Sequence, residues 1–146
     1  ILGSGDLFDA PACARMMRET GVDGVTIARG CIGNPWIFAE CVSLGRGEPL
    51  PPPPSVPEQG RVIAEHFRET VDHVGEHKAG QVMRKFGIKY SELHPGGLAV
   101  RDAFIRATTT ADFQRVLDEW YAPDKTWPAT RRREGFGDLI AAGACE

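Results

Sequence analysis

Two short loops near the start of the chain combine glycine with residues that bind anions. The first reads Gly3-Ser4-Gly5-Asp6, and the second reads Ala28-Arg29-Gly30 after a β-branched stretch. Glycine lets the backbone approach a ligand closely, and free N–H groups there and at a helix N-terminus bind phosphate. An arginine can add a bidentate contact. The pattern predicts a site for a phosphate-bearing ligand, formed by Ser4, Gly5, Asp6, Ala28, Arg29 and Gly30. The alternative is that these glycines only serve tight turns.

Alternating strand and helix signals surround the two loops. A strand ends at Leu2, a helix spans residues 11–20 between an Asp9 N-cap and Gly21, and a second strand spans 24–28. A second helix follows, capped by Asn34 with Pro35 in its first position. The residues expected on its buried face are Ile37, Phe38, Cys41 and Val42.

This order predicts parallel strands with right-handed crossovers, an α/β arrangement. Two successive βα loops of this kind form the phosphate site after strands seven and eight of TIM barrels. Two parallel strands cannot close a sheet or cover both its faces. We therefore expect residues 1–44 to be the last two βα units of such a barrel, with the missing strands upstream in a longer protein or in another copy.

The rest of the chain is expected to be all-α. Residues 45–57 are rich in proline and predict a stiff polyproline II linker, with an SH3 or WW ligand as the alternative reading. Residues 58–122 predict a small antiparallel four-helix bundle. Its helices are expected from the Ser55 capping box to about 77, over 79–93, over 98–107, and after Thr110. Residues 123–146 have little periodicity and predict a loosely attached, poorly ordered tail.

Composition excludes several classes of protein. The 146 residues carry a formal net charge of −3, which argues against a nucleic-acid binder that is basic all over. No apolar stretch approaches the roughly 20 residues of a membrane span. The four cysteines lack CxxC spacing, so we expect reduced thiols in a cytoplasmic protein. His73 and His77 have no third ligand nearby, so no metal site is expected.

Basic residues gather in the middle helices. Residues 78–106 contain six basic and two acidic residues, a net charge of +4, whereas the helix before them is acidic. Such a distribution is typical of a surface that contacts a nucleic-acid backbone, and the predicted contacts are Arg84, Lys85, Lys89 and Arg101. The alternatives are a solvated helix face, or ion pairs of Arg84 and Lys85 with acids of the preceding helix.

Three segments resemble the tRNA-dihydrouridine synthase family, particularly its NifR3-like (DusB-type) branch. They are residues 3–9, residues 21–30 and residues 33–38, the last reading Gly-Asn-Pro-Trp-Ile-Phe. Met83-Arg84-Lys85 with Tyr90, and Arg101 with Phe104, add to the resemblance, which covers residues 1–121.

The resemblance implies an FMN-binding TIM barrel followed by a helical domain that helps to hold tRNA. Family members reduce the C5=C6 bond of uridines and use NADPH to reload the flavin. The six loop residues above correspond to the FMN phosphate cradle, where Ser4 replaces the usual Asn. The catalytic cysteine belongs to an earlier barrel loop, so no residue of this chain is assigned that role, Cys31 included. We expect the chain alone to be inactive and to bind FMN weakly.

Two alternatives stay open. One is an FMN barrel oxidoreductase that acts on a small molecule, because a phosphate cradle does not choose the substrate. The other is a non-catalytic, RNA-binding or purely structural helical module.

Overall fold

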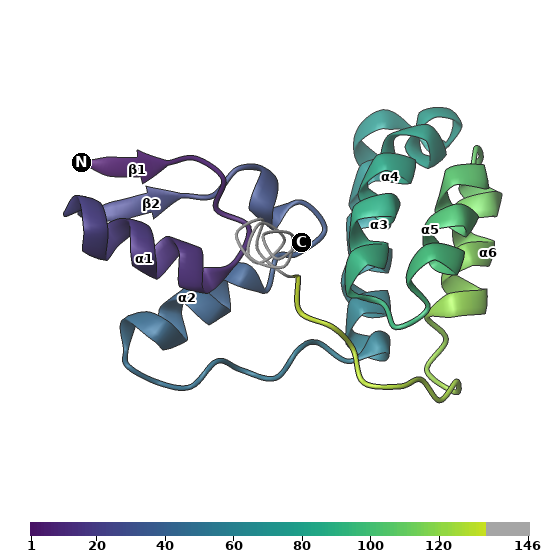
Figure 1. Ribbon diagram of the computed structural model, residues 1–146. Helices are drawn as coiled ribbons and strands as arrows, with labels where there is room; N and C mark the ends of the chain where they lie inside the picture. The colour runs from purple at the N-terminus through teal and green to yellow at the C-terminus, as the bar shows by residue number, and fades with distance from the viewer. Residues whose placement is uncertain (134–146) are drawn as a thin grey trace, which may run out of the picture. The chain divides into compact units, whose positions relative to one another are not determined.

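The computed structural model of the chain describes residues 1–133, which fall into two units (Figure 1). The first contains residues 1–52 together with Arg132 and Arg133, and the second contains residues 53–131. The elements of the first unit are β1 (Leu2–Ser4), α1 (Ala10–Thr20), β2 (Gly24–Thr26), the 3-10 turn η1 (Arg29–Cys31) and α2 (Ile37–Gly45).

The strands β1 and β2 pair in parallel, which confirms the predicted strand arrangement. Leu2 lies opposite Gly24, and Ser4 lies opposite Thr26. The Thr26 hydroxyl also donates to the Gly3 carbonyl at 3.3 Å. Because the strands run the same way, the loops that follow them leave the sheet at the same edge.

Helix α1 begins one residue earlier than expected, at Ala10, and ends at Thr20 as the sequence predicts. The Asp9 carboxylate accepts a hydrogen bond from the Ala12 N–H at 2.7 Å, which caps the first turn. Gly21 ends the helix at φ 68°, a left-handed conformation that glycine adopts without strain. Cys13 is buried where α1 packs against α2.

Helix α2 differs from its prediction in its start and in its buried face. It begins at Ile37, because the preceding residues form separate turns, with the Ile37 N–H donating to the Asn34 carbonyl at 3.4 Å. Ile37 is fully buried, but Phe38 and Val42 are 50% and 51% exposed. Among the described helices and strands, α1 is the main packing partner of α2, with a smaller contact from η1, and neither covers Phe38 and Val42.

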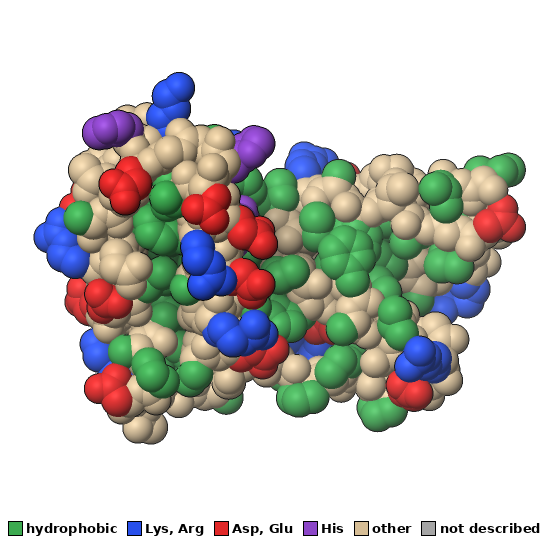
Figure 2. All heavy atoms as spheres, turned by 180° about the vertical axis from the view of Figure 1, so that it is seen from behind, with side chains coloured by type: hydrophobic (Ala, Val, Ile, Leu, Met, Phe, Trp, Pro, Cys, Tyr) green, Lys and Arg blue, Asp and Glu red, His purple; other side chains and the backbone are tan. Residues whose placement is uncertain are grey.

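Other hydrophobic side chains of this unit are also exposed. Ile1 is 89% and Leu2 67% exposed, and Met17 and Ile32 are partly exposed as well. Figure 2 shows hydrophobic side chains on the visible face of this unit, in the right-hand part of the view.

The second strand is shorter than expected. The sequence predicts a strand over 24–28, but β2 ends at Thr26.

The second unit consists of α3 (Val56–Val74), α4 (Glu76–Tyr90), the 3-10 turn η2 (Ser91–Leu93), α5 (Gly97–Arg106) and α6 (Thr110–Trp120). Helix α4 contacts α3, α5 and α6. The side chains of the core are fully or almost fully buried and include Ile63, Met83, Val100, Phe104 and Phe113. Two predicted helices end earlier than expected: the first at Val74, before Gly75 at φ 81°, and the second at Tyr90, where η2 begins.

Close helix packing in this unit depends on one glycine in particular. A Cβ atom on Gly87 of α4 would lie 2.4 Å from the ring of Phe104 on α5. Real Cβ atoms do not approach a ring so closely, so the absence of a side chain at Gly87 is what lets α4 and α5 pack here.

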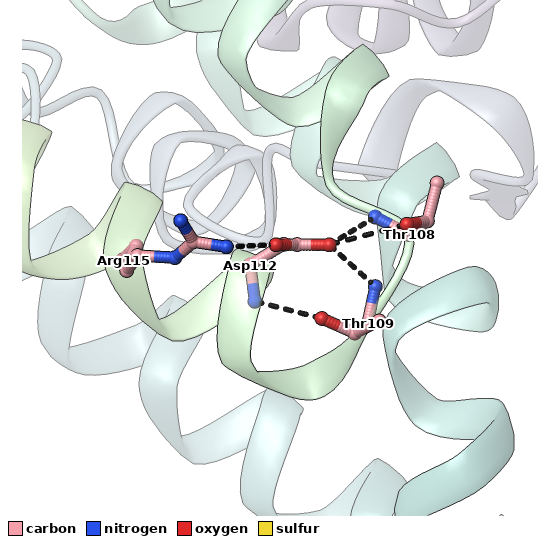
Figure 3. A network of polar contacts seen from close by, with 4 residues as sticks. All are labelled: Thr108, Thr109, Asp112 and Arg115. Carbon is pink, nitrogen blue, oxygen red and sulfur yellow. Dashed lines mark hydrogen bonds and ion pairs between the residues drawn. The ribbon is translucent and has the colours of Figure 1, made fainter.

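The N-terminus of α6 carries a complete capping box (Figure 3). The Thr109 hydroxyl accepts from the Asp112 N–H at 3.1 Å, and the Asp112 carboxylate accepts from the Thr109 N–H at 3.0 Å. Thr108 adds its N–H and hydroxyl to the same carboxylate oxygen, and Arg115 pairs with the other oxygen. The side-chain oxygens of Thr109 and Asp112 thus accept from backbone N–H groups that a helix start leaves without partners.

Residues 123–133 are better attached than the prediction of a loose tail implies. The Trp127 ring stacks on the Trp120 ring, with 5.7 Å between ring centres, and forms a T-shaped pair with the His94 ring at 4.6 Å between centres. The Arg131 N–H donates to the Leu93 carbonyl at 3.2 Å. Residues 134–146, the rest of that predicted tail, lie outside the described residues.

Candidate functional site

The two glycine-containing loops enclose one pocket at the edge where β1 and β2 end. Its volume is about 120 Å³, and the residues that line it are Ser4, Gly5, Asp6, Leu7, Phe8, Thr26, Ala28, Arg29 and Gly30. All six residues predicted from the sequence are therefore brought together. Leu7, Phe8 and Thr26 line the pocket too and were not predicted, because the sequence signal was limited to glycines and their polar neighbours. The pocket is several times larger than the ~10–15 Å³ that one water molecule requires.

The first loop turns sharply after β1. Gly5 has φ 129° and Asp6 has φ 44°, so two successive residues adopt positive φ. Glycine does this freely, and aspartate is one of the few other residues that tolerate the left-handed region. A Cβ on Gly5 would meet no atom within 4 Å, so the backbone at this residue faces open space.

The second loop packs directly on the first. Gly30 is buried, and a Cβ atom there would lie 1.8 Å from the Leu7 carbonyl oxygen and 3.1 Å from the Phe8 Cα. No side chain fits in that space. The walls of the pocket are thus two backbone segments in contact, and Gly30 is required by the contact itself.

The two charged residues of the pocket lining, Asp6 and Arg29, form an exposed ion pair. The Arg29 guanidinium donates to the Asp6 carboxylate at 2.6 Å and lies 5.7 Å from the centre of the Phe8 ring. The two side chains are 74% and 73% exposed, so water screens their attraction. The pair holds the guanidinium beside the pocket while its remaining N–H groups can still reach an anion.

A contact from the far end of the chain reaches the same loop. The Arg133 guanidinium donates from Nη1 to the Gly30 carbonyl and from Nη2 to the Ile32 carbonyl, both at 2.9 Å. The adjacent Arg132 binds the Glu40 carboxylate and the Pro51 carbonyl. The basic run at 131–133 was visible in the sequence, but no local pattern indicates that it binds residues a hundred positions away.

The described cysteines are free thiols. Cys31 lies beside the pocket but not in its lining, and its thiol donates to the Ala28 carbonyl at 3.1 Å. Burial, followed by the adjacent Cys41 thiol, raises the pKa of Cys13 to about 12. Such a thiol is a weak nucleophile at neutral pH. Cys145 lies outside the described residues.

The four predicted RNA-contacting residues are exposed on two adjoining helices. Arg84, Lys85 and Lys89 lie on α4, and Arg101 lies on α5. Lys89 pairs with Glu92 at 2.9 Å, and Arg101 lies 4.0 Å from Asp102. Within residues 1–133, neither Arg84 nor Lys85 forms an ion pair with an acidic residue of α3, which removes one of the alternatives considered above.

Neither a membrane span nor a metal cluster occurs in residues 1–133. No helix among them is long and apolar enough to cross a membrane. They also contain no group of three or more His, Cys, Asp or Glu side chains arranged to hold a metal ion.

Comparison with known proteins gives a consistent result. The sequence model of the family described as "Dihydrouridine synthase (Dus)" matches residues 1–124. The chain is 37% identical over 118 residues to a "Probable tRNA-dihydrouridine synthase" of Mycobacterium leprae (strain TN), which covers 81% of this chain and 31% of that protein. It is 39% identical over 118 residues to a protein of the same description from Mycobacterium tuberculosis (strain ATCC 25618 / H37Rv), covering 81% and 30%.

A third relative matches nearly the whole chain. This is the "tRNA-dihydrouridine synthase B" of Xanthomonas axonopodis pv. citri (strain 306), 31% identical over 142 residues, which is 97% of this chain and 38% of that protein. The chain spans about a third of the length of these curated relatives. Since the family match extends over most of the sequence and includes both pocket loops, the chain belongs to the dihydrouridine synthase (Dus) family.

Proposed function

We propose that this chain is part of an FMN-dependent tRNA-dihydrouridine synthase, which reduces the C5=C6 bond of uridines in tRNA with NADPH as the reductant. The observation that carries the proposal is the pocket between the two strand exits, in a chain of the Dus family. The pocket joins loop backbone, a hydroxyl and a guanidinium at one edge of a parallel sheet, the edge at which α/β proteins bind ligands.

The residues that line the pocket suit the phosphate of FMN. Backbone N–H groups of Gly5, Ala28 and Gly30 and the hydroxyl of Ser4 would hold the phosphate oxygens, and Arg29 would add a charged donor. Gly5 leaves open space where a side chain would otherwise stand. Asp6 does not bind the phosphate in this proposal; its carboxylate holds the Arg29 guanidinium in place.

When bound, FMN would supply the hydride for reduction of the uracil ring. The part of this chain in that reaction is to anchor the flavin by its phosphate, so that the ring system is held in one orientation. No residue of the chain is assigned as the catalytic acid; in this proposal that group would lie in the part of the complete polypeptide that corresponds to the portion of the relatives outside this chain.

We further propose that β1 to α2 are the last two βα units of a TIM barrel. The relatives are about three times as long as this chain, which leaves room for the other units. The exposed side chains of Leu2, Phe38 and Val42 are the surfaces that neighbouring barrel elements would cover. The chain by itself would then be inactive and would bind FMN weakly.

The helical unit would hold tRNA, with Arg84, Lys85, Lys89 and Arg101 as contacts to the phosphate backbone. Its support is the net charge of +4 over residues 78–106, in a chain whose formal charge is −3. In Figure 2 acidic and basic side chains are interspersed on the visible face of this unit.

The proposal includes a cytoplasmic location, where tRNA and reduced thiols are found.

The direct test is to purify the complete polypeptide and to measure bound flavin, then NADPH-dependent formation of dihydrouridine in unmodified tRNA. We expect a yellow protein that releases FMN on denaturation and that forms dihydrouridine. A colourless protein that does not take up added FMN would contradict the proposal. A flavoprotein that oxidises NADPH with a small-molecule acceptor but leaves tRNA unchanged would support the small-molecule oxidoreductase instead.

A further inference from the structure

The Arg133 side chain binds the backbone of the loop over residues 28–32, part of which lines the pocket. Arg133 itself is not among the residues that line the pocket. Its two terminal nitrogens donate to the carbonyls of Gly30 and Ile32, each at 2.9 Å. The guanidinium is planar and rigid, so these two bonds fix the positions of two carbonyls relative to each other. Because the donor is a charged guanidinium, both are charge-assisted hydrogen bonds, which are about twice as strong as neutral ones.

These carbonyls belong to the end of the 3-10 turn η1 (Arg29–Cys31) and to the residue that follows it. The last carbonyls of a short helical turn lack partners within the turn, and cations are favourable there. A three-residue turn has one internal hydrogen bond near its end, from the Ile32 N–H to the Arg29 carbonyl at 3.3 Å. The shape of the turn therefore depends on bonds from elsewhere.

The turn and the pocket lining share two residues, Arg29 and Gly30. Gly30, whose carbonyl Arg133 holds, is the residue that packs against the Leu7 carbonyl. Arg29, one position earlier, carries the guanidinium beside the pocket. A shift of the turn would thus have two effects at once. It would move the Arg29 backbone, and it would open the contact between Gly30 and the Leu7 carbonyl.

The neighbouring arginine has a different role. Arg132 pairs with Glu40 of α2 and with the Pro51 carbonyl, and both of these partners lie outside the 28–32 loop. Desolvation raises the pKa of the Glu40 carboxyl, while Arg132 counteracts that shift. Arg132 thus attaches the chain segment to the first unit, and Arg133 is the residue that reaches the loop.

We propose that Arg133 is a positioning residue of the phosphate pocket, which holds the 28–32 loop in its anion-binding shape through the carbonyls of Gly30 and Ile32. The identity of the anion as the FMN phosphate rests on the proposed function. Arg133 does not contact the ligand in this assignment.

The test compares FMN with riboflavin, which lacks the phosphate, in the complete polypeptide. Dissociation constants are measured by quenching of flavin fluorescence in Arg133→Gln and Arg133→Lys, with Arg132→Gln as the matched control. We expect Arg133→Gln to weaken FMN binding about tenfold, by analogy with residues that orient metal ligands, and to leave riboflavin binding unchanged. Arg133→Lys keeps the charge but cannot bridge both carbonyls, so it should recover part of the loss. Arg132→Gln should bind FMN more tightly than riboflavin by the same factor as the wild type.

Hydrogen exchange of the backbone amides 28–32 in the flavin-free protein gives a second measurement. Faster exchange in Arg133→Gln, with no change in Arg132→Gln, is expected. Unchanged FMN affinity, or an equal loss of FMN and riboflavin, would overturn the assignment of Arg133. A wild-type protein that does not distinguish the two flavins would overturn the proposed function instead, and the exchange measurement would then decide the role of Arg133 alone. If Arg133→Gln does not fold, Arg133→Lys carries both measurements.

Discussion

Arg29 and Asp6 are 23 positions apart in the sequence, and the guanidinium of the first lies 2.6 Å from the carboxylate of the second. The contact exists because β1 and β2 are parallel neighbours, so the loops after them leave the sheet side by side. Both residues were predicted as pocket residues, but the sequence did not indicate that they pair. The ion pair places the Arg29 guanidinium beside the pocket that the two loops line.

Replacing Arg29 by alanine should weaken FMN binding and leave riboflavin binding nearly unchanged. A hydrogen bond to a charged group contributes about 1.5–3 kcal/mol, so the expected loss in FMN affinity is about tenfold to a hundredfold. Stability should change by less than about 1 kcal/mol, because an exposed ion pair contributes little. Fluorescence titration and denaturant unfolding of the complete polypeptide measure the two effects. An equal loss for both flavins would show that Arg29 does not act on the phosphate.

Replacing Gly30 by alanine should disrupt the pocket itself. The new Cβ would lie 1.8 Å from the Leu7 carbonyl oxygen, so the two loops must separate. Overpacking of this kind costs about 1–3 kcal/mol, and FMN affinity should fall with it. The matched control is Gly45→Ala at the end of α2, where a Cβ meets no atom within 4 Å. Equal thermal unfolding midpoints for the two variants would contradict the close approach of the loops.

Reversing the charges of Arg84 and Lys85 should weaken tRNA binding under the proposed function. Removing one cation that binds a phosphate lowers the dependence of log Kd on log salt concentration by about 0.7–0.9, so the double variant should reduce the slope by about 1.4–1.8. The control reverses the charges of Arg61 and Arg68, which are exposed on the acidic helix α3. This control changes the net charge by the same amount. Filter binding of tRNA at several salt concentrations measures both. The same weakening in both double variants would indicate a general charge effect and no specific surface.

The stability of the helical unit should fall as the pH decreases below about 6.5, which is the pKa of an ordinary histidine. His94 is fully buried; its Nδ1 accepts from the Gly96 N–H at 2.8 Å, so Nε2 carries the proton and donates to the Trp120 carbonyl at 2.9 Å. Burial lowers the pKa of His94. The unfolded chain therefore binds a proton before the folded chain does, and stability present above pH 6.5 is lost below it.

Unfolding by denaturant at pH 7.5 and pH 5.5 measures this dependence. His94→Gln should be less stable at pH 7.5 but should show a smaller difference between the two pH values. Burial also lowers the pKa of His66, so some dependence should persist. His77→Gln, an exposed control at the start of α4, should behave as the wild type. A pH dependence unchanged in His94→Gln would remove His94 as its source.

Removal of the Thr109 hydroxyl should destabilise the N-terminus of α6. A Thr→Ala change at an N-cap costs about 1 kcal/mol, and Thr126→Ala, outside any helix, is the control. Hydrogen bonds from Thr109, then from Thr108, hold the pKa of the Asp112 carboxyl well below its usual range (Figure 3). The contribution of the Asp112 charge to the stability of the fold is thus complete above about pH 4, and it is lost at more acidic pH. In Thr109→Ala this acid dependence should be smaller, as acid titration followed by circular dichroism would show.

Several features follow from the sequence because they depend on groups close together in the chain. The caps of α1 at Asp9 and Gly21, and the Ser55 cap of α3, involve partners within four residues. The pocket residues were predictable for a related reason. Parallel strands in a βαβ unit bring their following loops to one edge, whatever the rest of the protein contains.

Only the tertiary structure decided the features that depend on distant partners. Phe38 and Val42 have the spacing of a buried face, yet they are exposed, because burial depends on which elements pack on α2. His94 gave no signal in the sequence and lies fully buried among Trp120, Tyr121 and Trp127. Arg133 binds the carbonyls of a loop a hundred residues away. Local hydrogen bonds are specified by residue type and spacing, whereas these contacts exist only once the folded chain has brought separate segments within reach.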